Sequence, residues 1–167
     1  MLQGRHLCAA FLLCAVALLA AQQARPGVLS ADEVKKLAPT TYYFAGQSAP
    51  VQTRNTVGFR NATGKVTLAG FVDTSGYAAD IQQKYQGLFI TETKLDVGGS
   101  QLPPGEYGFG FLKDNKFIIM NVAAEEIFTV ASQTDDKLAR PVPLKVTEDG
   151  GGYKLYAGRQ WVSLKAE

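Results

Sequence analysis

The chain has 167 residues, and its 17 Lys and Arg nearly balance its 15 Asp and Glu. The basic residues form no run, so the sequence lacks the clustered positive charge that nucleic-acid binding requires. We therefore expect the partner to be a small molecule, a glycan or an envelope protein, and not a nucleic acid.

The first 24 residues have the anatomy of a secretory signal peptide. Two basic residues, Arg5 and His6, precede an apolar stretch from Leu7 to Ala21, and small residues follow it. The apolar stretch is short for a membrane span, which needs about 20 apolar residues. We expect cleavage between Ala20 and Ala24, and export to the periplasm or the extracellular space. A retained N-terminal anchor is the alternative.

Removal of this leader would take every histidine and cysteine with it. His6, Cys8 and Cys14 all lie in the leader, so residues 25–167 contain no imidazole and no thiol. Ser-His-Asp and Cys-His catalysis, the usual zinc sites and disulfides are therefore excluded there. We expect one domain over residues 25–167, with no membrane span, no cofactor, no metal site and no assigned catalytic residue.

Residues 28–39 carry a helix signature. Ser30 can cap the helix, Glu33 stands where a capping box requires it, and Pro39 ends the run. The predicted helix is short, so it needs to dock on the rest of the fold to persist.

After Pro39 the hydrophobic pattern changes from helical to alternating, which predicts about eight to ten short strands. We expect them at residues 41–46, 56–60, 65–73, 87–97, 106–112, 116–122, 126–132, 142–147 and 153–157, with a last strand ending at Leu164. The sequential hairpins favour antiparallel order. The sequence thus predicts an all-β fold, an antiparallel β-sandwich, with a closed barrel as the alternative.

One segment, residues 75–87, interrupts the strands. Tyr77, Ile81 and Tyr85 recur at helical spacing, which predicts an inserted helix. We interpret this tyrosine face as core packing and not as a binding surface.

One expected strand has an aromatic face and a bare face. Its alternating residues are Tyr107, Gly108, Phe109, Gly110 and Phe111. Strand glycines mark a bend, a bulge or the close approach of another group. Packing of the inserted helix over Gly108 and Gly110 is the structural interpretation, and a ligand groove at these glycines is the functional one. The aromatic face is expected in the core.

Several aromatic residues lie near the two ends of the predicted domain. If the terminal strands are neighbours, these rings would share an exposed patch, and Tyr and Trp are common at interfaces and stack on sugars. The candidate binding residues of this patch are Tyr42, Tyr43, Tyr153, Tyr156 and Trp161. Burial of each ring in the core is the alternative.

Carboxylates are the main remaining candidates for acid–base catalysis. Glu92 and Glu106 lie in or beside strands, and a glycosidase needs two carboxylates across a cleft. Exposed charges on a sheet are the structural interpretation. The turn Asn61-Ala62-Thr63 matches a glycosylation sequon, although as a turn it needs no such role.

Residues 93–122, TKLDVGGSQLPPGEYGFGFLKDNKFIIMNV, resemble uncharacterised exported bacterial β-sandwich proteins that carry an LPAGTYSL-type signature before a strand ending in Asn. The matching residues are Gly99, Leu102, Pro103, Gly105, Tyr107 and Asn121. The departures are Pro104, Glu106, Gly108 and Gly110. The resemblance implies a periplasmic β-sandwich and carries no activity.

Three functions follow as hypotheses. The first is an exported non-enzymatic binding or envelope-associated module of unknown ligand. The second is a lipocalin-like carrier of a small apolar ligand, which a barrel with an open interior would support. The third is a carboxylate-based polysaccharide hydrolase, which requires two partly buried carboxylates facing each other across a cleft.

Overall fold

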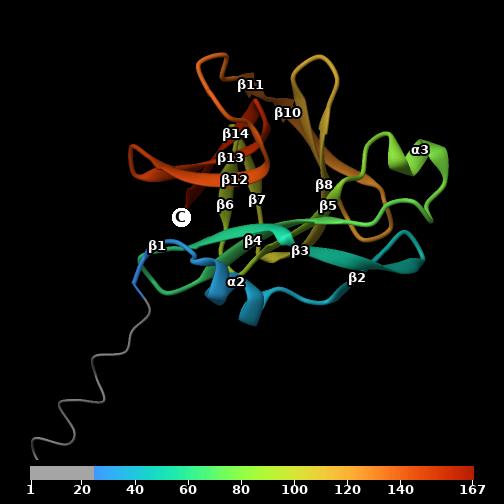
Figure 1. Cartoon of the computed structure of the whole chain (residues 1–167), viewed down its shortest axis with the longest axis horizontal. Helices are drawn as coiled ribbons and strands as arrows, with labels where there is room; N and C mark the ends of the chain where they lie inside the picture. Colours follow the sequence, from blue (N-terminus) through green and yellow to red (C-terminus); the bar gives the residue numbers. More distant parts are fainter. Residues whose placement is uncertain (1–24) are drawn as a thin grey trace, which may run out of the picture.

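The computed structural model describes residues 25–167, and the predicted leader with His6, Cys8 and Cys14 lies outside them. The described residues form two antiparallel sheets and two short helices (Figure 1). The predicted all-β sandwich is confirmed, and neither sheet closes into a barrel within this range. None of the helices in residues 25–167 is long and apolar enough to cross a membrane.

The first sheet has eight strands, in the order β1–β3–β4–β5–β8–β9–β10, with β2 paired to β3 off this path. Their bounds are β1 (Gly27–Val28), β2 (Thr41–Phe44), β3 (Gln47–Arg60), β4 (Val66–Val72), β5 (Gly87–Thr91), β8 (Gly105–Leu112), β9 (Lys116–Met120) and β10 (Glu126–Ala131). Strands that are close in sequence pair with one another, because short connections favour hairpins.

The second sheet has six strands, in the order β12–β13–β14–β6–β7, with β11 paired to β14. Their bounds are β6 (Leu95–Val97), β7 (Ser100–Leu102), β11 (Gln133–Thr134), β12 (Val142–Asp149), β13 (Gly152–Gly158) and β14 (Gln160–Ala166). In Figure 1 this sheet stacks on the first, with β12 and β13 above β3 and β4.

The expectation of one strand over residues 87–97 is wrong. The strand ends at Thr91 and resumes at Leu95 in the other sheet. Between them the Thr91 hydroxyl donates to the Thr93 carbonyl at 2.7 Å, which closes a local turn. The strands β1, β7 and β11 are two or three residues long, too short for alternation to reveal them.

The main core lies between the two sheets. The aromatic face of β8 points into it, with Tyr107, Phe109 and Phe111 at most 9% exposed. Side chains from the second sheet, among them Leu155 and Val162, pack against this face. The core interpretation of the aromatic face is therefore confirmed.

A second core covers the opposite face of the first sheet. The helix α2 (Ala31–Leu37) contributes Val34, and the β2–β3 hairpin contributes Tyr42 and Phe44. The predicted capping box is present, because the Ser30 backbone N–H donates to Glu33 Oε2 at 2.9 Å and the Ser30 hydroxyl accepts from the Glu33 N–H.

The inserted helix is shorter than the sequence predicts. The helix α3 spans only Ala79–Gln82, while Tyr77 and Tyr85 outside it are 6% and 1% exposed. The two rings pack edge to face, with centroids 5.3 Å apart, in the second core. The tyrosine spacing thus reports core packing, as expected, and the segment is held by its tertiary contacts because a single turn is not stable alone.

The bare face of β8 is covered. A Cβ atom at Gly108 would collide with the ring of Phe44, and one at Gly110 would collide with the backbone carbonyl of Lys84. Phe44 is in turn stacked on Tyr85 at a centroid distance of 3.8 Å. The glycines let β2 and the inserted segment lie directly on the sheet, and these elements fill the space that a ligand groove would need.

Candidate functional site: a cleft at one end of the sandwich

The five candidate aromatic residues lie in two different sheets. Tyr42 and Tyr43 are on β2, beside the first sheet, whereas Tyr153 and Tyr156 are on β13 and Trp161 is on β14, in the second. The terminal strands β2 and β14 are not paired neighbours. The structure therefore does not bring these rings together in a single patch.

The two tyrosines of β2 point to opposite sides of the strand. Tyr42 is 4% exposed, and its hydroxyl donates to the Tyr107 carbonyl at 3.1 Å. Burial raises the pKa of the Tyr42 hydroxyl above its usual range. Tyr43 is 57% exposed. Tyr42 is thus a core residue, and Tyr43 alone of this pair is accessible.

Tyr156 and Trp161 are cross-strand partners on the second sheet, with ring centroids 6.2 Å apart. The ammonium of Lys154 lies 4.4 Å from the centroid of the Trp161 ring and 3.0 Å from Asp149 Oδ2. Tyr156 is only 8% exposed. Lys154 thus lies over one face of the Trp161 ring, and the buried Tyr156 adds little accessible aromatic surface to the pair.

Tyr153 is the candidate that borders a cleft. Its ring stacks on Phe59 at a centroid distance of 3.8 Å, and its hydroxyl donates to the Arg60 carbonyl at 3.2 Å. Burial, and to a smaller extent the negative charge of Glu148, raise the pKa of the Tyr153 hydroxyl. The tyrosine is therefore held rigidly between the two sheets, with a carboxylate close by.

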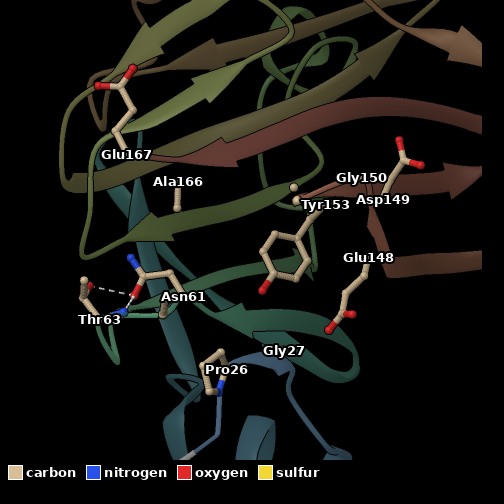
Figure 2. Close-up of a pocket in the computed structure, with 13 residues that line it drawn as sticks. Pro26, Gly27, Asn61, Thr63, Glu148, Asp149, Gly150, Tyr153, Ala166 and Glu167 are labelled. Atoms are coloured by element: carbon tan, nitrogen blue, oxygen red, sulfur yellow. Dashed lines mark hydrogen bonds between the residues drawn. The ribbon is translucent and has the colours of Figure 1, made fainter.

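The cleft has a volume of about 600 Å³ and lies at one end of the sandwich. Four segments that are distant in sequence form its wall: residues 26–27, the β3–β4 turn at 61–63, the tip of the β12–β13 hairpin at 148–153, and residues 166–167 at the end of β14. Figure 2 shows Asn61 and Glu148 on either side of Tyr153, with Pro26 below and Ala166 above. Such a site exists only once both sheets are assembled.

Asn61 is the most buried polar group of this cleft, at 7% exposure. Its Oδ1 accepts three hydrogen bonds, from the Thr63 N–H at 3.0 Å, the Thr63 hydroxyl at 2.9 Å and the Lys65 N–H at 2.9 Å. These bonds fix the orientation of the amide, so Nδ2 points away from Thr63, on the side where Ala166 lies (Figure 2). Nothing in residues 25–167 accepts a hydrogen bond from Nδ2.

Three carboxylate side chains line the cleft, and they differ in their partners. Asp149 pairs with Lys154 at 3.0 Å, and Glu167 pairs with Lys94 at 2.7 Å. Glu148 has no ion pair within the described residues. Of the described residues that line the cleft, none is Lys or Arg, so its wall carries net negative charge.

The carboxylates that the sequence offered for hydrolysis lie elsewhere. Glu92 and Glu106 are both exposed, and neither lines the cleft. Glu92 Oε2 accepts a hydrogen bond from the Val66 N–H at 2.7 Å, which is a structural contact. Each Asp and Glu of residues 25–167 is exposed or half-buried. Within the same range, no three His, Cys, Asp or Glu come together as metal ligands.

Sequence reasoning missed Asn61 and Glu148 as site residues. Both lie in turn sequences, NATG and EDGGG, whose composition explains a hairpin without any further role. The glycosylation sequon was the one sequence feature that singled out Asn61. It indicated a surface turn but did not reveal the cleft.

No protein-family model, no curated protein and no solved structure matches this chain. The resemblance of residues 93–122 to exported bacterial β-sandwich proteins therefore stays a prediction.

Proposed function

We propose that this protein is an exported, non-enzymatic binding module that takes a small ligand in the cleft beside Tyr153. The observation that carries this proposal is the cleft itself, because about 600 Å³ is within the size range of small-molecule sites. Its wall combines apolar surface from Tyr153 and Pro26 with a few polar groups, as such sites do.

Two observations favour binding over the other functions. A carrier of the lipocalin kind needs an open barrel, whereas here two open sheets enclose a packed core. A hydrolase of the glycosidase kind needs a carboxylic acid whose pKa is raised by burial, and none of the described Asp and Glu side chains is buried. Export itself rests on the composition of residues 1–24.

A thermal-shift screen of the purified full chain tests the proposal, because a ligand that binds the native state raises its Tm. The probes are neutral oligosaccharides, spermidine, palmitate and calcium chloride. Ala62 is an exposed turn residue on the cleft wall, so Ala62→Trp should narrow the cleft without disturbing the core. Ala123→Trp, in the exposed turn after β9, is the matched control.

We expect at least one probe to raise the Tm of the wild-type chain and of Ala123→Trp, but not that of Ala62→Trp. A panel without any shift would contradict the proposal. So would a shift that survives Ala62→Trp, because the ligand would then bind outside the cleft.

A further inference from the structure

We infer that the ligand of the cleft is a neutral saccharide, an inference that rests on the proposed function. The Asn61 residue is more than nine-tenths buried, while its Nδ2 has no acceptor in the described structure and keeps contact with solvent at the cleft. Because three donors already occupy Oδ1, the amide cannot flip to hide Nδ2 without losing them. The two N–H groups of Nδ2 therefore require an acceptor from a ligand or from water.

Glu148, in contrast to Asn61, requires a hydrogen-bond donor from the ligand. Its carboxylate is acceptor-only, has no ion pair in residues 25–167, and lies on the other side of Tyr153 (Figure 2). A ligand that spans the cleft must therefore present an acceptor to Asn61 and a donor to Glu148. A hydroxyl group can both accept and donate a hydrogen bond, so a ligand with several hydroxyl groups can bond to Asn61 and to Glu148 at once.

The charge and the polar groups of the wall disfavour three other ligand classes: anions, apolar molecules and simple ammonium ions. An anion would be repelled by Glu148 and by the residual field of Asp149 and Glu167. An apolar ligand would bury Nδ2 of Asn61 and the Glu148 carboxylate without partners, which is unfavourable for both. A simple ammonium ion would satisfy Glu148 but would leave the Asn61 donors without an acceptor.

The remaining surface of the cleft suits the C–H faces of a sugar ring. Pro26 and Tyr153 contribute apolar surface between the two polar walls (Figure 2). Aromatic rings commonly contact sugars in this way, and a hydroxyl of the ligand can also donate to the Tyr153 oxygen, which already donates to Arg60 and keeps its acceptor capacity.

The test measures binding of the full chain to a neutral mono- to tetrasaccharide array, followed by titration of the strongest sugar in solution. Production in a host without N-glycosylation keeps Asn61 unmodified. Asn61→Asp retains the Oδ1 acceptor that holds the turn and replaces the Nδ2 donors by a negatively charged acceptor. Glu148→Gln retains the shape and removes the charged acceptor. Glu106→Gln, an exposed carboxylate outside the cleft, is the matched control.

We expect Glu148→Gln to weaken sugar binding about ten-fold or more, because bonds to charged groups are the stronger ones. We expect Asn61→Asp to change the affinity about five-fold or more, because the group that faces the sugar turns from a neutral donor into a charged acceptor. Glu106→Gln should bind like the wild type, and all three variants should keep the wild-type circular dichroism spectrum. Sugar binding whose affinity neither cleft variant changes would overturn the inference.

Parallel titrations with spermidine, polygalacturonate and calcium chloride separate this inference from the proposed function. If spermidine or calcium binds in a way that Ala62→Trp abolishes, while no neutral sugar binds, the cleft is a binding site but the saccharide inference is wrong. If no probe binding depends on Ala62, both fail.

Discussion

Gly110 offers the sharpest test of the packing between the first sheet and the inserted segment. A Cβ atom at this position would collide with the carbonyl of Lys84, a backbone atom that cannot swing aside as a side-chain end would. Gly110→Ala should therefore push residues 79–86 away from β8. The aromatic stack of Phe44 on Tyr85, at 3.8 Å, would be disturbed with it.

The magnitude follows from two opposing contributions. Overpacking of a core costs about 1–3 kcal/mol, and a backbone collision lies at the upper end. The loss of glycine freedom in the unfolded chain offsets about 0.4–1 kcal/mol of this. We expect a net loss of about 2 kcal/mol, equivalent to a Tm lower by roughly 4–8 °C for a domain of this size.

The assay is urea unfolding followed by tyrosine and tryptophan fluorescence, with hydrogen exchange of residues 79–86 as a local readout. Gly76→Ala is the control, because Gly76 has an ordinary φ and the new Cβ would have room. The atom nearest to that Cβ would be Gln47 Nε2, at an ordinary contact distance of 3.7 Å. That variant should stay within about 0.5 kcal/mol of the wild type or be more stable. If Gly110→Ala behaves like Gly76→Ala, the close approach of Lys84 does not exist in solution.

Three further predictions concern the caps and the buried hydroxyls. Ser30→Ala should lower the unfolding free energy by about 1 kcal/mol, because the capping box of α2 is lost; an unchanged midpoint in urea would contradict this. Tyr85→Phe should be neutral or stabilising by up to about 1 kcal/mol, since its buried hydroxyl has no partner in the described residues, whereas Tyr42→Phe should cost about 1 kcal/mol. Burial raises the pKa values of Tyr42, Tyr85 and Tyr153, so their neutral forms are favoured in the folded state. The contribution of these tyrosines to the unfolding free energy should thus be constant below their unfolded pKa near 10 and should decrease as the pH rises above it. The decrease should be smaller in Tyr42→Phe than in the wild type, and equal alkaline slopes in these two proteins would refute this assignment.

The local features of the fold were predictable from neighbouring residues. The capping box of α2, the hairpins and the burial of the aromatic face of β8 depend on contacts within a few positions or on strand alternation, so sequence patterns report them. The glycine face was ambiguous in sequence, because its glycines are equally consistent with a groove and with close packing. Only the position of Phe44 and Lys84 shows that it is packed.

The division of strands between the two sheets was not predictable. Residues 87–97 are rich in strand-forming side chains throughout, and the change of sheet after Thr91 depends on which partner strands are available. The same division separates Tyr42 and Tyr43 from Tyr153, Tyr156 and Trp161.

The sequence by itself determined the β class, the first helix and the absence of imidazole and thiol groups after residue 14. The tertiary structure alone decided that Asn61, Tyr153 and Glu148 share a cleft. The physical reason is that residue type and periodicity act over a few positions, whereas the cleft arises where segments about 90 residues apart meet at the end of two stacked sheets.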